Sequence, residues 1–414
     1  MAEAKTGSLL APFAALRPTA ETAPAVAARP YDVLSQAEAV AGAAGRPLSF
    51  LHVSRAEIDL PEGTDPHAPA VYLQAAEALR GMEKARVLIR DDQPAYYPYR
   101  MTAADGHVQT GIAAAGSIAA YRSNRIRRHE HTRPDKELDR TRQIEAVGAQ
   151  TGPVLTVHPP DTELASLIAE ATAQPPLADA TTDDGTRHQT WAMNDPATIA
   201  TVTRCFETMA AIYIADGHHR SAAAARVAEA RAETLSPHTD ERFLLVSFPT
   251  DQVRILPYNR IVRTLGDLTP ALFIAQLRDS FAVSTEDDPV QPAVGGEFGV
   301  YLAGQWFRLT CRDAPAGPPT EHLDVSRLNQ LILAPLLGIT DTRTDPRIDF
   351  VGGGRGLPDL IARVDNGEAA VAFVLHPTSL AELMAVADAG EVMPPKSTWF
   401  EPKLADGLLS LPLD

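Results

Sequence analysis

A carboxylate, two imidazoles and a guanidinium lie within one short segment of this chain. The segment reads Ala215-Asp216-Gly217-His218-His219-Arg220-Ser221. An apolar run with β-branched and aromatic residues, 210–214, precedes it, and an alanine-rich run, 221–230, follows it. Strand formers followed by helix formers predict a strand, a turn and a helix. Polar side chains gathered at such a turn are typical of an active site.

The predicted turn has the properties of an anion-binding site. Gly217 can adopt a positive φ or let a ligand approach closely, and the N–H groups that follow it lie at the positive end of the helix dipole. A phosphate suits such a helix terminus. Arg220 would add a bidentate donor, His218 could move a proton, and Asp216 could act as a base, orient a histidine or hold a metal ion.

A structural role for the same residues is the alternative. Asp216 would then only cap the helix, and His218, His219 and Arg220 would form a solvated first turn. Consecutive helical residues project about 100° apart, so His218 and His219 are not expected to ligate one metal ion together. A paired-histidine zinc site is therefore disfavoured.

Composition limits the class of protein. The chain has 414 residues, of which 45% are hydrophobic and 22% are charged, as expected for a globular protein with two or more packed units. Its formal charge of −16 argues against a nucleic-acid partner. Cys205 and Cys311 indicate neither a disulfide framework nor a zinc ribbon. The sequence shows no secretory signal and no membrane-spanning run, so we expect a soluble, cytoplasmic protein; an oligomer is left open.

Two further segments could carry chemistry. A basic loop with His129, His131 and Arg133 precedes a charged run that starts with Pro134 and is predicted to be a helix. Near the C-terminus, Lys396, Ser397 and Thr398 could hold phosphate oxygens. The alternatives are a solvated, salt-bridged face for the first segment and a loop anchored by its aromatic residues for the second.

The remaining elements are expected from residue patterns. Strands are predicted at 48–53, 87–89, 154–158, 243–248, 255–262 and 371–375, with a hairpin formed by 299–302 and 306–309. Helices are predicted at 35–44, 71–82, 135–145, 270–281, 324–337 and 379–389.

Several spaced motifs resemble those of a bacterial family called domain of unknown function 1015. The segments that carry the resemblance are 216–220, 129–135 and 393–403, and the segments 29–33 and 52–57 look like the family's early motifs. The similarity covers nearly the whole chain after residue 28. The family name itself implies no reaction.

The strand, the Asp-Gly-His-X-Arg turn and the helix are also distantly similar to the ParB and sulfiredoxin superfamily, which includes free serine kinases. This resemblance implies a mixed α/β (α+β) fold: a lead-in at 1–28, a ParB/sulfiredoxin-like catalytic core with large insertions at 29–245, and a C-terminal α/β extension at 246–414 whose end returns to the site. In the serine kinases this turn handles phosphate, metal and substrate, and an earlier glutamate is the base. That pattern implies catalytic roles for Asp216, His218, Arg220 and Glu57.

Together these observations predict a kinase-like phosphotransferase that acts on a small hydroxyl compound such as serine or a hydroxy acid. The expected cofactor is Mg²⁺, held by Asp216, with ATP, ADP or pyrophosphate as the phosphate donor. The residues expected to bind the cofactor are Gly217, His219, Ser221, His129, His131, Arg133, Lys396, Ser397 and Thr398. The alternative is a non-catalytic, nucleotide-binding metabolic regulator of ParB-like type.

Overall fold

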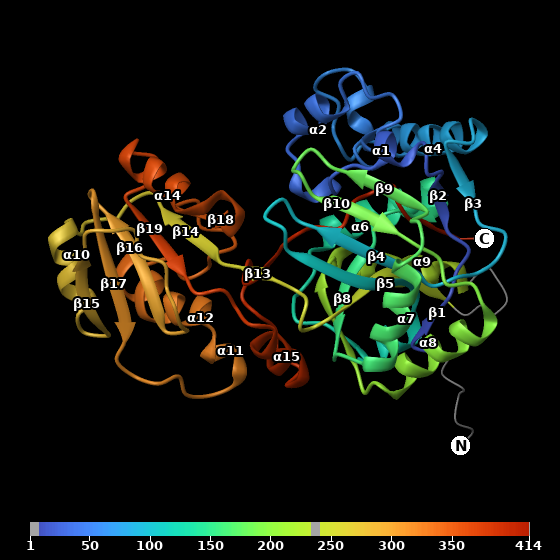
Figure 1. The fold of residues 1–414 in the computed structure, drawn as a ribbon. Helices are drawn as coiled ribbons and strands as arrows, with labels where there is room; N and C mark the ends of the chain where they lie inside the picture. The colour runs from blue at the N-terminus through green and yellow to red at the C-terminus, as the bar shows by residue number, and fades with distance from the viewer. Residues whose placement is uncertain (1–7, 233–240, 414) are drawn as a thin grey trace. The chain divides into compact units, whose positions relative to one another are not determined.

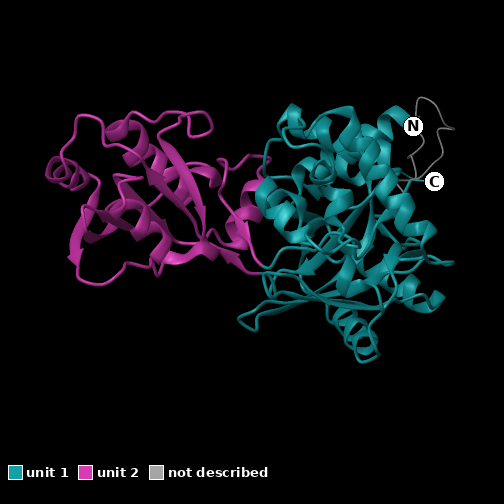
Figure 2. Ribbon diagram, turned by 90° about the horizontal axis from the view of Figure 1, so that it is seen from above, with its two compact units in different colours: residues 1–253, 402–414 teal, residues 254–401 magenta. Residues whose placement is uncertain are grey.

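The chain divides into two compact units in the computed structural model, which describes residues 8–232 and 241–413 (Figure 1). Unit 1 comprises residues 1–253 and 402–414, and unit 2 comprises residues 254–401 (Figure 2). Both units mix helices with sheets, so the fold is mixed α/β as expected. No described helix has the length and apolar character needed to cross a membrane.

A nine-stranded mixed sheet forms the centre of unit 1. Its strand order is β6-β11-β8-β12-β5-β4-β10-β9, and β1 pairs with β5 outside this path. The strands of this unit are β1 (Leu10–Ala11), β2 (Leu16–Pro18), β3 (Leu88–Arg90), β4 (Tyr97–Thr102), β5 (Val108–Ser117), β6 (Ile126–Arg127), β7 (Ala149–Gln150), β8 (Val154–His158), β9 (Ala178–Thr181), β10 (Arg187–Thr190), β11 (Ile212–Asp216), β12 (Arg242–Pro249) and β21 (Leu411–Pro412).

The helices of unit 1 lie in the chain segments that connect its strands. They are α1 (Ala23–Val26), η1 (Tyr31–Val33), α2 (Gln36–Ala43), α3 (Leu51–Ser54), η2 (Ala56–Asp59), α4 (Pro69–Lys84), α5 (Ile118–Arg122), α6 (Pro134–Val147), α7 (Thr162–Thr172), α8 (Pro196–Thr208) and α9 (His218–Ala232). Pro134 suits the first turn of α6 because its missing N–H would have no partner there. Helix α6 packs along α9, which brings the basic loop before α6 toward the start of α9.

Strand β11 is buried between two neighbours, which fixes where the chain leaves the sheet. It runs parallel to β6 and antiparallel to β8. Ile212 and Ile214 on this strand are fully buried in an apolar cluster with Phe243 and Leu245 of β12. The end of β11, and with it Asp216, is therefore positioned by the core of unit 1.

Unit 2 contains a six-stranded sheet of order β15-β17-β16-β19-β14-β18 and a two-stranded pair, β13-β20. Its strands are β13 (Ile255–Leu256), β14 (Tyr258–Val262), β15 (Phe281–Glu286), β16 (Glu297–Leu302), β17 (Gln305–Cys311), β18 (Ile348–Gly352), β19 (Val371–Leu375) and β20 (Trp399–Phe400). Its helical segments are α10 (Pro270–Leu277), α11 (Pro319–His322), α12 (Asp324–Leu328), η3 (Asn329–Leu333), α13 (Ala334–Leu337), η4 (Gly353–Arg355), α14 (Gly356–Asp365) and α15 (Leu380–Asp388).

Most of the elements expected from the sequence are confirmed, but the strand expected at 48–53 is wrong. That segment enters helix α3, and Phe50, Leu51 and Val53 are buried there. The N–H of Phe50 donates to the carbonyl of Val26 at 2.9 Å, and the N–H of Val53 donates back to the carbonyl of Phe50. A short apolar run does not distinguish a strand from a helical turn, and here a local helix satisfies the backbone.

The unit boundaries differ from the expected divisions at residues 28 and 245. A boundary at 245 would cut through β12, which pairs with both β5 and β8. Residues before 28 contribute β1 to the large sheet and β2 to a pair with β3. At the other end, residues 402–414 return to unit 1 (Figure 2), where β21 pairs with β7.

Candidate anion-binding site

The predicted strand, turn and helix are confirmed at 212–232. Asp216 is the last residue of β11, Gly217 has a φ of 98°, and α9 begins at His218. A positive φ is costly for a residue with a side chain, so glycine suits this turn. A Cβ at Gly217 would also meet the Arg220 guanidinium carbon at 3.1 Å. Glycine therefore lets Arg220 fold back over the turn.

Two cations surround the Asp216 carboxylate. The Lys403 ammonium donates to Asp216 Oδ2 at 3.0 Å, and Arg220 Nη2 lies 3.6 Å from the same oxygen. Burial by itself would raise the pKa of Asp216, but the charges of Lys403 and Arg220 hold it well below the ordinary value. Asp216 is therefore a permanent anion around neutral pH.

Arg220 connects Asp216 with a second carboxylate. Its Nη2 lies 3.5 Å from Asp32 Oδ2, and its Nη1 donates to the carbonyl of Pro153. Burial would lower the pKa of Arg220, but Asp32 and Asp216 raise it further above the ordinary value. Among the described residues, Arg220 Nε has no hydrogen-bond partner although it is buried. One N–H group of this guanidinium is thus left to bind something else.

The two histidines of the turn contact the basic loop that precedes α6. The N–H of His129 points at His218 Nε2 at 3.5 Å, and the N–H of Arg133 donates to His219 Nε2 at 3.1 Å. The His129 and His218 rings meet edge to face with centroids 4.4 Å apart. His218 Nδ1 lies 3.7 Å from Glu130 Oε2, which favours a proton on Nδ1 and a lone pair on Nε2.

The histidine pair is buried and uncharged at neutral pH. Burial lowers the pKa of His129 to about 4, opposed by a hydrogen bond to the Ile214 backbone and the charge of Asp216. Burial and the neighbouring His129 lower the pKa of His218 well below the ordinary value. The Nε2 atom of His218 is thus a neutral nitrogen that can accept a hydrogen bond.

Acidification should destabilise the fold through these histidines. The unfolded His129 has a pKa near 6.5 and the folded one a pKa of about 4. Between these pH values the unfolded chain therefore binds more protons than the folded one. The contribution of His129 to the free energy of unfolding is thus present above pH 6.5 and is lost as the pH falls toward 4. In the variant His129→Gln we expect the free energy of unfolding to fall less steeply with decreasing pH than in the wild type, by about 1.4 kcal/mol per pH unit in this window. Denaturant unfolding at a series of pH values measures this slope.

Other buried groups with shifted pKa values also contribute to the measured pH dependence of stability. Burial lowers the pKa of His158 to about 3 and of His188 to about 4, which adds to the acid sensitivity, whereas burial raises the pKa of Asp406 to about 7, which opposes it. The exposed His131 provides the matched control, since His131→Gln should keep the wild-type slope. Equal slopes for His129→Gln and the wild type would contradict the buried, neutral state of His129.

Some expected site residues lie at the turn with other roles. Ser221 is fully buried and its hydroxyl donates to the carbonyl of His218 at 3.0 Å, so it serves the first turn of α9 and is not open to a ligand. Arg133 reaches His219 through its backbone, while its side chain is exposed and pairs with Asp135 at 2.8 Å. His131 is exposed and has no polar contact with the turn among the described residues.

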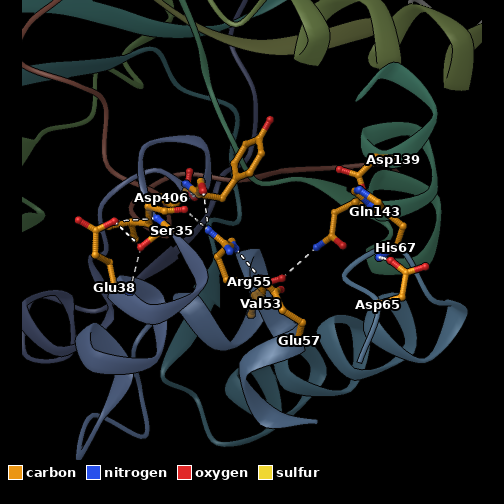
Figure 3. Close-up of polar contacts among 12 residues, drawn as sticks. Ser35, Glu38, Val53, Arg55, Glu57, Asp65, His67, Asp139, Gln143 and Asp406 are labelled. Carbon is orange, nitrogen blue, oxygen red and sulfur yellow. Dashed lines mark hydrogen bonds and ion pairs between the residues drawn. The ribbon is translucent and has the colours of Figure 1, made fainter. Parts of the chain in front are cut away.

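Glu57, expected as the base, pairs with Arg55 and has no hydrogen bond or ion pair with the turn among the described residues. Arg55 Nε donates to Glu57 Oε1 at 2.6 Å, and Figure 3 shows the two side chains next to each other. Glu57 is buried, and within the described part of the chain its polar contact is with Arg55. The charge of the Arg55 guanidinium therefore balances that of the Glu57 carboxylate.

Lys396, Ser397 and Thr398 belong to unit 2. The carbonyl of Lys396 accepts a hydrogen bond from Arg260 at 2.9 Å, and its ammonium lies 5.8 Å from the centre of the Tyr258 ring. The Ser397 hydroxyl donates to the carbonyl of Pro394 at 2.6 Å. A role of these residues in phosphate binding stays a prediction. The contact between the C-terminal segment and the turn is made by Lys403.

The turn does not fit Mg²⁺ as its residues stand. The charge of Asp216 is already used by Lys403 and Arg220, and a divalent cation would have to displace them. Over residues 8–232 and 241–413 no group of three or more His, Cys, Asp or Glu side chains could hold a metal ion. Asp216 as a magnesium ligand is therefore not supported by its surroundings.

Four residues at the site were missed as site residues by sequence reasoning: Tyr31, Asp32, Lys403 and Asp406. Tyr31 and Asp32 belong to the motif at 29–33, and Lys403 ends the motif at 393–403, so a signal existed for these three. Asp406 had none. Its Oδ2 accepts the N–H of Tyr31 at 3.1 Å, across a long stretch of sequence.

The chain belongs to the family described as protein of unknown function (DUF1015), whose model matches residues 10–326. No match is found among the curated proteins.

Solved structures show only weak similarity. Free serine kinase in complex with AMP gives a TM-score of 0.34 at 15% identity, covering 67% of this chain and 84% of that one. A conserved hypothetical protein from Pyrococcus furiosus gives 0.34 at 16% identity, covering 69% and 91%. SbnI with a C-terminal truncation from Staphylococcus aureus gives 0.37 at 12% identity, covering 73% and 87%. TM-scores this low do not by themselves establish a common fold.

Proposed function

We propose that this protein is a phosphotransferase that moves a phosphoryl group from a nucleotide or pyrophosphate to a small hydroxyl compound. The observation that carries the proposal is the meeting of Arg220, Lys403 and the N-terminus of α9 around Asp216. Phosphoryl transfer needs mainly positioning and stabilisation of negative charge. Cations and helical N–H groups in a partly buried turn supply both.

The neutral histidines add a hydrogen-bond acceptor. His218 Nε2 carries a lone pair and, among residues 8–232 and 241–413, receives only the long contact from the His129 N–H at 3.5 Å. Burial holds the pKa of His218 well below its ordinary value, so this imidazole stays neutral and can accept a hydrogen bond from a bound ligand. Arg220 and Lys403 would hold the phosphate oxygens, and Asp216 would hold both cations in place.

The resemblance of the turn to that of the free serine kinases supports the same class of reaction, and with it a ParB/sulfiredoxin-like core for unit 1. Asp216, Gly217, His218 and Arg220 match the pattern, with His219 at the variable position. The reaction proposed for this chain draws on these four residues and on Lys403, and no step is assigned to a metal ion.

A second candidate is a nucleotide-binding regulator without catalysis. The pairing of Glu57 with Arg55 favours it, because the glutamate expected as the base is held in an ion pair and, among the described residues, makes no polar contact with the turn. Such a protein would bind the nucleotide tightly without converting it.

A substrate screen separates the two candidates. The purified chain is incubated with ATP, ADP or pyrophosphate and a panel of hydroxy acids, and phosphorylated products are detected by mass spectrometry. We expect a product with the wild type and a loss of about 10²-fold or more in the Asp216→Asn variant, because Lys403 and Arg220 lose the charge that positions them. The exposed Asp92→Asn variant is the control.

Calorimetry with the same donors completes the assignment. Tight donor binding by the wild type without any product would favour the regulator. Neither product nor donor binding, with Asp216→Asn indistinguishable from the wild type, would refute an anion site at this turn.

A further inference from the structure

A small cavity lies beside the turn, within unit 1. It measures about 30 Å³, which is room for about two water-sized groups. Residues from four separate helical segments and from the C-terminal segment line it: Tyr31, Ser54, Arg140, Gln143, Arg220 and Asp406 are among them. Arg220 thus belongs both to the turn and to the wall of this cavity.

Three of the lining residues carry buried polar atoms without a partner. Arg220 Nε, Ser54 Oγ and Asp406 Oδ1 have no hydrogen bond of good geometry among the described residues, although the Ser54 hydroxyl lies near enough to Asp406 to lower its pKa. Asp406 is 1% exposed, Ser54 8% and Arg220 9%. An unsatisfied buried polar group costs about 1–3 kcal/mol. Three such atoms around one cavity indicate that a polar ligand completes them.

The backbone leaves this space open. Gly152 also lines the cavity, and a Cβ there would meet Arg220 Cδ at 3.2 Å and Asp406 Oδ1 at 3.7 Å. A single atom at this point would therefore touch both Arg220 and Asp406, which shows how closely the two approach. A side chain at residue 152 would occupy part of the ligand's space.

The three atoms suit a hydroxyl group. Arg220 Nε is a donor, Asp406 Oδ1 is an acceptor, and the Ser54 hydroxyl can be a donor. A hydroxyl donates one hydrogen bond and accepts two, which pairs all three atoms. A carboxylate could not donate to Asp406, and an ammonium group could not accept from Arg220. Water is the remaining group that could satisfy the three atoms.

We propose that this cavity binds the hydroxyl group of the phosphate acceptor and that Asp406 is the general base that takes its proton; this inference rests on the phosphotransferase function proposed above. The acceptor is a compound with a slim hydroxyl-bearing end, since the cavity admits about two small groups. Asp406 replaces Glu57 in this role.

The reaction step is balanced by these groups. The acceptor O–H bond breaks and its proton moves to Asp406 Oδ1. The acceptor oxygen forms a bond to phosphorus, and the bond between that phosphorus and the leaving oxygen of the nucleotide or pyrophosphate breaks. Arg220 Nε stabilises the charge that develops on the attacking oxygen. A nucleotide donor leaves with one phosphate fewer, and a pyrophosphate donor leaves as inorganic phosphate.

The electrostatic environment of Asp406 suits a base. Burial raises its pKa to about 7, Arg220 on α9 lowers it, Asp32 on η1 raises it, and the Tyr31 N–H and Ser54 on α3 lower it. Tyr31 stays protonated near neutral pH because burial raises its pKa to about 12. Arg140 of α6, the other cation on the wall, stays charged, since the Asp139 carboxylate raises its pKa against the effect of burial.

The test compares Asp406→Asn, Asp406→Glu and Ser54→Ala with the wild type, with the exposed Asp92→Asn as the matched control. The assay uses the donor and acceptor that give product in the wild type, and donor affinity is measured by calorimetry. Asp406→Asn keeps the shape of the side chain and an oxygen for the Tyr31 N–H. Denaturant unfolding of each variant checks that it folds.

We expect Asp406→Asn to lower kcat by about 10²-fold or more while the donor Kd changes by less than about threefold. The wild-type rate should rise with pH through about 7, because the carboxylate form is the base, and this inflection should be absent in Asp406→Asn. Asp406→Glu should regain part of the rate, and Ser54→Ala should raise the KM for the acceptor.

Four results would overturn the inference. The first is a full rate in folded Asp406→Asn, which leaves the phosphotransferase itself intact. The second is an equal loss of donor affinity in that variant, which would place Asp406 with the donor. The third is a wild type that forms no product with any donor; the proposed function then fails and the base fails with it. A crystal structure with the acceptor bound elsewhere and water in the cavity would also overturn it.

Discussion

Replacement of Arg220 by methionine should lower the free energy of unfolding of unit 1 by about 1–3 kcal/mol. The guanidinium is 9% exposed and lies within 3.6 Å of Asp216 and 3.5 Å of Asp32. Removing it leaves Asp32 and Asp216, whose side chains are 37% and 30% exposed, without their shared cation, although Lys403 still pairs with Asp216. Asp406 loses a neighbouring positive charge as well. Native-state hydrogen exchange of β11 and α9 amides measures the change in unit 1 directly.

The matched control for this variant is Arg204→Met. Arg204 pairs with Glu163 at 2.6 Å, but both side chains are at least half exposed, so little change is expected. Arg220→Lys should recover part of the loss, since it restores the charge but not the planar fork. A change in Arg220→Met no larger than in Arg204→Met would show that the charge network around the turn contributes little to stability.

Replacement of Lys403 by methionine should weaken pyrophosphate binding about tenfold, or about 1.4 kcal/mol. Its ammonium is largely buried and lies 3.0 Å from Asp216 Oδ2, beside the first turn of α9. Without it a bound phosphate loses one cation and the charge of Asp216 is less well balanced. The pKa of Asp216 should rise accordingly, because Lys403 is the largest influence that lowers it.

Two other lysines make this experiment decisive. Lys84 is exposed at the end of α4, so Lys84→Met should bind pyrophosphate like the wild type. Lys396→Met tests the expectation from the sequence that Lys396 holds phosphate. If Lys396→Met weakens binding and Lys403→Met does not, the anion site would lie in unit 2 and not at the turn of unit 1.

Local patterns determined much of the secondary structure. The strand at 212–216, the glycine turn and the helix from 218 follow from residue types that favour each conformation, and the structure has them at those places. The helix after Pro134 was predictable for the same reason. The segment 48–53 was not, because its apolar residues are buried in a helical turn held by the carbonyl of Val26.

The composition of the site depended on contacts between distant parts of the chain. Sequence order alone suggested Glu57 as the base and Lys396 as the phosphate ligand, whereas the structure pairs Glu57 with Arg55 and brings Lys403 to Asp216. The motif at 393–403 spans the boundary at residues 401 and 402, so its lysines fall in different units. No local pattern marks such a boundary.

The sequence by itself determined that a carboxylate, a glycine, two histidines and an arginine stand at the start of a helix, because that depends only on neighbours along the chain. Tertiary structure decided which charges surround them: Lys403 and Asp406 arrive from the end of the chain, and Asp32 from near its beginning. The interaction of charges depends on distance in space and on burial, and neither follows from position in the sequence. The structure therefore turns a predicted phosphate-binding turn into a buried charge network with a cavity beside it.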